Sequence, residues 1–208
     1  MKVILCPNRF CYYDYHQQEI DDNPKNHHLF ITLRKAYNYN PAGFIGDSLM
    51  TAKGDCIIGY QACMWGEHIP DFRQMEHQAF PRTACISEFC WTDGARRDFD
   101  GFCVRLLKEF QRLDARDVNY SRAFWQVIVN MNLENPYPRE VELELDYPYA
   151  RIHYTTDGSE PTASSPVYSG PMTMQQGDMV RARGFKADGT PVGTVMTKKF
   201  QPIDTPKR

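Results

Sequence analysis

Runs of consecutive apolar residues alternate with amphipathic segments along the first half of the chain. Two runs, Val3–Cys6 and Cys56–Trp65, are typical of strands buried on both faces. Three segments carry apolar residues at helical spacing: Leu29–Tyr37, a stretch from about Asp71 to around Glu88, and a stretch from Asp98 to about Leu113. The order of strand, helix, strand and helices predicts two βα units.

Two local signals add to this pattern. Asp98 directly precedes the last helical segment and is predicted to be its N-cap, because an aspartate at that position accepts hydrogen bonds from the first backbone amides of a helix. The stretch Gly43–Gly54, which begins and ends with glycine, predicts a loop between the first helix and the second strand.

The second half of the chain alternates apolar and polar residues at period two. Val141–Leu145 and Ile152–Thr155 show this alternation, which is typical of strands with one buried face. Turn dipeptides follow at short intervals, at Asp157-Gly158, Ser169-Gly170, Gln176-Gly177 and Asp188-Gly189. Short strands separated by regular turns predict a small β-sandwich. We therefore expect an α/β region over residues 1–125 and a β-sandwich over residues 126–208.

Composition and charge narrow the functional classes. With 42% apolar and 24% charged residues, the chain has the composition of a soluble globular protein. The formal net charge of −2 provides no basic field for nucleic acid or an anionic membrane, and no stretch approaches the roughly 20 apolar residues that span a bilayer. We expect neither nucleic acid nor a membrane as a partner. The apolar run at the N-terminus is too short for a signal peptide.

The seven cysteines all lie in the first half of the chain. Their number is odd, and none forms a C-x-x-C pair or combines with histidine at zinc-ligand spacing. We expect buried structural thiols, because free cysteine behaves as a small hydrophobic residue. Glu67-His68 lacks the second histidine that a zincin helix needs. The sequence therefore predicts neither a metal site nor a cofactor.

Aromatic and acidic residues come together directly after each predicted strand. Tyr12 and Asp14 follow the first strand, and Trp65 and Glu67 follow the second. In a parallel α/β barrel the C-terminal ends of the strands line the active site. An indole beside a carboxylate suits a sugar, which stacks on the ring and donates its hydroxyl hydrogens to the carboxylate. On spacing alone, the favoured explanation is that Tyr12, Tyr13 and Trp65 are core residues and that Asp14 and Glu67 cap helices.

Ordered motifs across residues 3–125 resemble the end of the catalytic domain of glycoside hydrolase family 20. These motifs are Val3–Pro7 leading into Tyr12–Tyr15, Leu33–Pro41, Gly59–Glu67, Phe80–Arg82 with Ser87, Glu88 and Trp91, and Arg112–Ala115 followed by Val118–Tyr120. The tail is similar to the chitobiase or fibronectin-like C-terminal β-sandwich, through Ile152–Thr162, Ser165–Tyr168 and Val180–Arg183. The segment Thr156–Pro161 is first of all a turn, with a place in a binding surface as the alternative.

The resemblance implies a β-N-acetylhexosaminidase, in which the 2-acetamido group of the substrate is the nucleophile. An Asp-Glu pair then orients that group and acts as general acid and base. By position, Tyr12 matches the tyrosine that donates to the acetamido carbonyl, and Trp65 matches an indole of the pocket wall. Asp14 and Glu67 match carboxylates that bind sugar hydroxyls in the −1 subsite.

The chain departs from the family pattern in one large respect. No His-x-Gly-Gly-Asp-Glu segment is present, so the implied catalytic pair is absent and no catalytic residue is assigned. A (β/α)8 barrel needs about 250 residues, whereas only the last two βα units are recognisable before the sandwich. Two such units leave strand edges and barrel-core side chains uncovered. Either the missing N-terminal barrel portion, the tail and helices, or another chain is expected to cover that face.

These inferences define the expected fold and function. The fold class is α/β, a partial TIM barrel, followed by an all-β sandwich. The function is that of part of a β-N-acetylhexosaminidase with a glycan containing N-acetylhexosamine as its partner, and the isolated chain is expected to be inactive. A non-catalytic carbohydrate-binding module and a purely structural module are the alternatives. The resemblance implies a periplasmic or extracellular location, and the preference between GlcNAc and GalNAc stays open.

Overall fold

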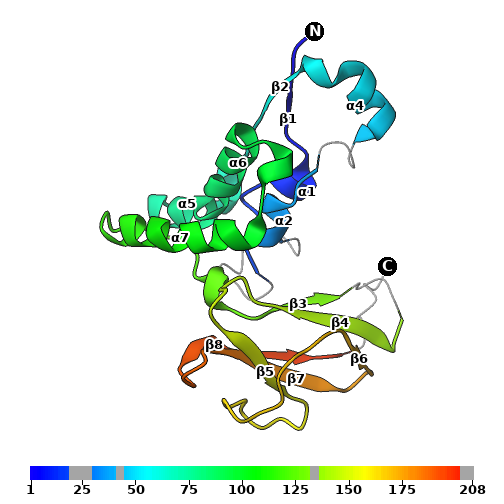
Figure 1. The fold of residues 1–208 in the computed structure, drawn as a ribbon, viewed down its shortest axis with the longest axis vertical. Coiled ribbons are helices and arrows are strands. Elements are labelled where there is room, and N and C mark those ends of the chain that lie inside the picture. The colour runs from blue at the N-terminus through cyan, green and yellow to red at the C-terminus, as the bar shows by residue number, and fades with distance from the viewer. Residues whose placement is uncertain (19–29, 41–44, 132–135, 202–208) are drawn as a thin grey trace. The chain divides into compact units, whose positions relative to one another are not determined.

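A computed structural model describes residues 1–18, 30–40, 45–131 and 136–201 of the protein (Figure 1). The chain divides into two compact units, Met1–Ser121 and Arg122–Arg208. Within the described ranges, no helix is long and apolar enough to cross a membrane.

The N-terminal unit contains two parallel strands, which lie beside α4 (Asp47–Lys53) (Figure 1). β1 (Val3–Leu5) pairs with β2 (Ile57–Tyr60), in a register that places Leu5 opposite Tyr60. The prediction that both faces are buried is wrong, because the side chains of Ile4 and Ile58 are 54% and 58% exposed. Two strands cannot close a barrel, and these two apolar side chains stay exposed in the described chain.

Short helices connect the two strands. α1 (Asn8–Cys11) follows β1, and α2 (Leu33–Tyr37) begins after Thr32, whose hydroxyl accepts a hydrogen bond from the Lys35 amide at 3.1 Å. The beginning of the predicted helix at Leu29 lies outside the described residues. The loop predicted over Gly43–Gly54 is wrong: α4 (Asp47–Lys53) and the 3-10 helix η1 (Gly54–Cys56) occupy most of it. Leu, Met, Ala and Lys favour a helix here more strongly than the flanking glycines disfavour it.

The helix predicted from Asp71 to Glu88 is two helices. α5 (Phe72–Ala79) begins after Asp71, whose side chain accepts a hydrogen bond from the Gln74 amide at 2.7 Å. α6 (Arg82–Trp91) begins after Pro81. Proline has no amide hydrogen to continue α5, and it favours an extended conformation for Phe80, so the helix ends at this dipeptide. Two 3-10 turns, η2 (Gly66–His68) and η3 (Gly94–Arg96), precede α5 and follow α6.

The long amphipathic helix α7 (Phe99–Asp114) agrees with its prediction from apolar spacing. Its buried residues share one face of the helix: Phe99, Phe102, Cys103, Leu106, Phe110 and Leu113. The Asp98 carboxylate accepts hydrogen bonds from the amides of Asp100 at 3.2 Å and Gly101 at 2.9 Å. The predicted N-cap is confirmed.

Replacing Asp98 with alanine is expected to lower the free energy of unfolding of the N-terminal unit by about 1 kcal/mol, because two amides at the start of α7 lose their acceptor. Asp98→Asn is the matched control, since asparagine caps as well as aspartate. Urea denaturation followed by circular dichroism measures both variants. Equal losses in Asp98→Ala and Asp98→Asn would contradict a capping role.

The seven cysteines are all free thiols with different exposure. Cys11, Cys85 and Cys103 are buried, as predicted. Cys90 is exposed at the end of α6, which corrects the prediction for that residue, and the remaining three are half-buried. Cys90 is one residue from the end of the helix. Apolar spacing alone does not distinguish the exposed Cys90 from the buried Cys85, because α6 is apolar on several sides.

The C-terminal unit is a β-sandwich, which confirms the prediction from period-two alternation. The 3-10 turn η4 (Ala123–Trp125) leads into two antiparallel three-stranded sheets. One sheet has the order β3 (Ile128–Met131), β4 (Arg139–Glu144), β6 (Met172–Met174), and the other has the order β5 (Arg151–Thr155), β7 (Met179–Phe185), β8 (Pro191–Lys199). Both sheets contribute to one core, which includes Val141, Leu143, Val180, Ala182 and Met196.

Candidate functional site

The segments that follow β1 and β2 are held together by backbone hydrogen bonds. The Cys63 amide donates to the Cys11 carbonyl at 2.8 Å, and the Tyr13 amide donates to the Cys63 carbonyl at 2.7 Å. An isolated parallel bridge joins Tyr12 to Cys63. The strand pairing therefore resumes after α1 and brings the two predicted aromatic and acidic clusters to one edge of the sheet.

Tyr12 and Trp65 are in direct contact at this edge. Their ring centroids lie 5.9 Å apart with an interplanar angle of 54°, and Tyr15 lies 5.9 Å from Tyr12 on centroids. Trp65 is 46% exposed. Because nearly half of its side chain meets solvent, the alternative in which Trp65 is a core residue does not hold for the described chain. A half-exposed indole is available to stack against the apolar face of a ligand.

The two predicted carboxylates differ strongly in exposure. Asp14 is 1% exposed and lies in the turn that follows Tyr12, whereas Glu67 is exposed in η2. Neither residue is the N-cap of a described helix, so the capping alternative is not supported. Exposure of a carboxylate depends on tertiary packing, and for this reason the sequence pattern did not distinguish Asp14 from Glu67.

Arg82 anchors the turn behind Tyr12, a role that the sequence did not reveal. Its side chain is fully buried, and its guanidinium donates to the carbonyls of Tyr13 at 2.6 Å, Gln78 at 2.6 Å and Ile31 at 3.2 Å. The Tyr13 hydroxyl in turn donates to the Arg82 carbonyl at 3.0 Å. An arginine at the start of an otherwise apolar helix was the signal that could have identified this anchoring role.

Burial keeps the Tyr13 hydroxyl in its donating form. Burial raises the pKa of Tyr13 well above its usual range, and the neighbouring Cys85 raises it further, while the Arg82 cation lowers it to a smaller extent. The guanidinium carbon of Arg82 lies 4.6 Å from the centroid of the Tyr13 ring. The reciprocal pair of Tyr13 and Arg82 thus fixes α6 against the segment that carries Tyr12 and Asp14.

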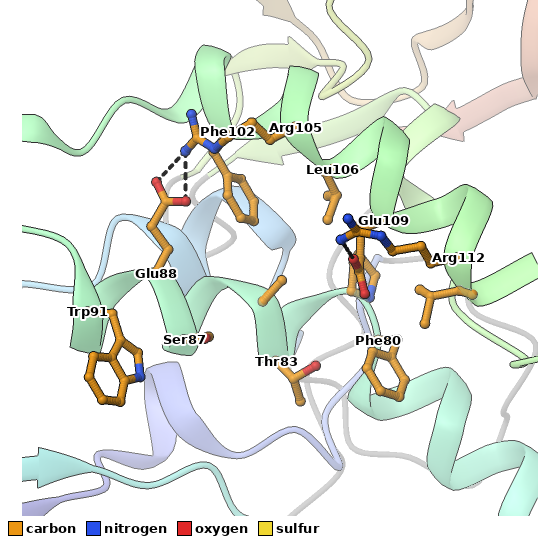
Figure 2. A pocket seen from close by; sticks show the side chains of 13 residues that line it. Phe80, Thr83, Ser87, Glu88, Trp91, Phe102, Arg105, Leu106, Glu109 and Arg112 are labelled. Atoms are coloured by element: carbon orange, nitrogen blue, oxygen red, sulfur yellow. Dashed lines mark hydrogen bonds and ion pairs between the residues drawn. The ribbon is translucent and has the colours of Figure 1, made fainter. Parts of the chain in front are cut away.

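A groove of about 550 Å³ lies elsewhere in the N-terminal unit, between α6 and α7 (Figure 2). Glu88 reaches from α6 to Arg105 on α7, with N–O distances of 2.6 and 2.7 Å. The Tyr37 hydroxyl donates to the same carboxylate at 2.8 Å, and burial together with this bond raises the pKa of Tyr37 to about 12. Glu88 is therefore engaged in packing α2, α6 and α7. None of the four predicted site residues lines this groove.

A second cavity, of about 440 Å³, belongs to the C-terminal unit. Its lining includes Tyr149, Arg151, His153 and Lys186. Tyr149 is 55% exposed, and the His153 ring nitrogen Nδ1 lies 2.8 Å from the Ser165 carbonyl, which assigns the Nδ1 hydrogen to that contact. The cavity therefore combines an exposed aromatic ring with three nitrogen-bearing side chains. In the part of the chain that the structure describes, no three His, Cys, Asp or Glu residues are grouped as metal ligands.

Comparison with known proteins relates each unit to a family. Residues 1–94 match the glycosyl hydrolase family 20 catalytic domain, and residues 134–197 match the chitobiase/beta-hexosaminidase C-terminal domain. The Beta-hexosaminidase of Porphyromonas gingivalis is 28% identical over 206 residues, which cover 97% of this chain and 26% of the relative. The Beta-hexosaminidase of Akkermansia muciniphila is 28% identical over 120 residues, covering 58% of this chain and 23% of the relative. The chain thus spans about a quarter of the length of these relatives.

Solved structures agree with this relation. The family 20 beta-N-acetylhexosaminidase of Streptomyces coelicolor is 26% identical, with a TM-score of 0.51 over 59% of this chain and 24% of its own. The exo beta-N-acetylglucosaminidase of Vibrio harveyi, solved with N-acetylglucosamine, is 30% identical, with a TM-score of 0.51 over 59% of this chain and 19% of its own.

The paired parallel strands, their helices and the comparisons define the N-terminal unit as part of a glycoside hydrolase barrel. More narrowly, residues 1–94 match part of the glycosyl hydrolase family 20 catalytic domain, and residues 134–197 match the C-terminal domain of chitobiases and β-hexosaminidases. The resemblance seen in the sequence is confirmed.

Proposed function

We propose that this chain supplies one wall of the −1 sugar subsite of a β-N-acetylhexosaminidase that hydrolyses terminal β-linked N-acetylhexosamines. The ring contact between Tyr12 and Trp65 at the ends of β1 and β2 carries the proposal. The half-exposed Trp65 indole forms an apolar surface for the pyranose and its acetamido methyl group. The Tyr12 hydroxyl donates a hydrogen bond to the acetamido carbonyl, which orients it for attack on the anomeric carbon.

The two carboxylates take different parts in this proposal. Glu67 is exposed and accepts hydrogen bonds from sugar hydroxyls directly. Asp14 is buried, so it meets a sugar hydroxyl only where the sugar displaces the side chains that cover it. A hydroxyl that pairs with a buried carboxylate contributes selectivity, because an analogue without that hydroxyl leaves the carboxylate without its hydrogen bond.

The proposed reaction is substrate-assisted hydrolysis with retention of configuration. These 208 residues contain no Asp-Glu pair of the family type, so the proton transfers to and from the leaving group require a polypeptide beyond them. The exposed Ile4 of β1 and Ile58 of β2 offer apolar surface against which a further barrel portion, or another chain, completes the site. A periplasmic or extracellular location is part of the proposal.

Sugar titration of the 208-residue chain tests the proposed wall. N-acetylglucosamine is expected to bind in the millimolar range in a calorimetric or NMR titration, and Trp65→Ala is expected to weaken binding at least tenfold, about 1.4 kcal/mol or more, by removing the stacking surface. Trp91→Ala is the matched control, because Trp91 is 87% exposed and lines the separate α6/α7 groove. The chain alone is expected to release no p-nitrophenol from the β-GlcNAc glycoside.

Two results would contradict the proposal. One is sugar binding that Trp65→Ala leaves unchanged, and the other is turnover of the glycoside by the pure 208-residue chain.

A non-catalytic carbohydrate-binding role is the second candidate, because the cavity of the C-terminal unit offers Tyr149, Arg151 and Lys186 to a ligand. Binding that survives Trp65→Ala and is lost in Tyr149→Ala would favour that role.

A further inference from the structure

Two thiols are in contact just beyond the ends of the parallel strands of the N-terminal unit. The Sγ atoms of Cys6 and Cys63 lie 3.2 Å apart although the residues are 57 positions apart in the sequence. Cys6 directly follows β1, and Cys63 lies beyond β2 at the bridge to Tyr12. Both residues are half-buried, so small molecules reach them more easily than the buried Cys11.

The strand register produces this meeting. Leu5 is the register partner of Tyr60, and the Gln61 amide donates to the Leu5 carbonyl at 3.0 Å, so the chain after β2 runs beside Cys6. The backbone of Cys63 is then fixed on both sides, by the carbonyl of Cys11 and the amide of Tyr13. Formation of a disulfide bond needs an approach of the sulfur atoms to about 2.05 Å, which is a small movement from the observed separation.

We propose that Cys6 and Cys63 form a disulfide bond when a small-molecule disulfide such as oxidised glutathione is present. The Cys63 thiolate attacks one sulfur of the oxidant, which forms a mixed disulfide and releases one glutathione thiolate. The Cys6 sulfur, on loss of its proton, then attacks the Cys63 sulfur and releases the second glutathione. Two protein thiols are oxidised, one oxidant disulfide is reduced, and the two protons pass to the glutathione thiolates.

The environment of Cys6 is consistent with the order of these steps. Burial, followed by the hydrogen bond shared with Cys63, raises the pKa of Cys6 to about 12. Cys6 is therefore protonated at neutral pH and is a poor first nucleophile. Once Cys63 carries a mixed disulfide, Cys6 is the adjacent thiol in position to resolve it.

The bond would join the end of β1 to the segment that carries Trp65. Cys63 is two residues before Trp65 and is bridged to Tyr12, so the cross-link closes a covalent loop that contains Tyr12 and ends two residues before Trp65. The inference does not depend on the proposed sugar site, because it rests on the two sulfur atoms and the strand register alone.

The experiment compares the 208-residue chain before and after incubation with oxidised glutathione. Two of the seven thiols are expected to disappear in a titration under denaturing conditions, and peptide mapping by mass spectrometry is expected to join Cys6 to Cys63. The midpoint of thermal unfolding is expected to rise by on the order of 5–10 °C, and a reductant is expected to reverse the rise, because the bond restricts the unfolded chain.

Cysteine variants supply the controls. Cys6→Ser and Cys63→Ser are each expected to abolish the cross-link, whereas Cys90→Ser, at the exposed cysteine, is expected to retain it. Peptide mapping of the wild-type chain shows whether Cys6 is joined to Cys63 even if a serine variant fails to fold. Retention of all seven thiols, glutathione attached only at Cys90, or a bond between Cys11 and Cys63 would overturn the proposal.

Discussion

Replacing Arg82 with methionine is expected to lower the free energy of unfolding of the N-terminal unit by about 3–5 kcal/mol. Methionine fills the space of the aliphatic stem but leaves the carbonyls of Tyr13, Gln78 and Ile31 buried without the hydrogen bonds that the guanidinium supplies. The loss is large because buried acceptors cannot turn to water. Urea denaturation followed by tryptophan fluorescence measures it.

A surface arginine provides the comparison. Arg112→Met removes the same charge from α7, where the Arg112 side chain is 70% exposed and pairs with Glu109 at 3.0 Å. An exposed pair of this kind contributes less than about 1 kcal/mol, since water screens it. If the two variants were equally stable, Arg82 would not be the anchor of the turn that carries Tyr12 and Asp14. A loss of stability shared with weaker sugar binding would connect this anchor to the proposed subsite.

Gly193→Ala is expected to destabilise the C-terminal unit by about 3 kcal/mol or more. Gly193 has a φ of 62°, in the left-handed region, and a Cβ at this position would overlap the carbonyl oxygen of Trp125. The close approach is needed because the Gln126 side chain accepts hydrogen bonds from the Thr194 amide at 3.0 Å and hydroxyl at 2.9 Å. An added methyl group must therefore separate β8 from the beginning of the unit.

Gly170→Ala is the control for this prediction. A Cβ at residue 170 meets no atom within 4 Å, and the residue does not have a positive φ. This variant is expected to change stability by less than about 0.5 kcal/mol. Thermal unfolding followed by circular dichroism compares the two variants, and a similar midpoint for both would show that the backbone near Trp125 relaxes without cost.

The sequence predicted most reliably those elements whose apolar pattern is long and whose ends are marked. α7 has several helical repeats and an aspartate at its start, and the β-sandwich has repeated alternation between turns. The prediction was wrong where local signals competed. Glycines around α4 suggested a loop, and apolar spacing from Asp71 to Glu88 continued across Pro81 although a helix cannot.

The candidate site could be predicted as a set of residues but not as a surface. Consecutive placement after two parallel strands indicated that Tyr12 and Trp65 share an edge, since parallel strands end on the same side. The burial of Asp14, the exposure of Ile4 and Ile58, and the anchoring role of Arg82 depend on contacts between distant segments. Periodicity along the chain contains no information on such contacts. The roles of the four proposed site residues, Tyr12, Asp14, Trp65 and Glu67, stay predictions.

The exposure of Ile4 and Ile58 on β1 and β2 has a thermodynamic consequence. Any polypeptide that lies against Ile4 and Ile58 stiffens the two strands whose ends carry Tyr12 and Trp65. If that stiffening raises the affinity of the site for a sugar by some factor, the sugar must raise the affinity for the polypeptide by the same factor. This reciprocity holds because binding free energies at two linked sites are coupled. Saccharide would then strengthen the association of that polypeptide with the two strands.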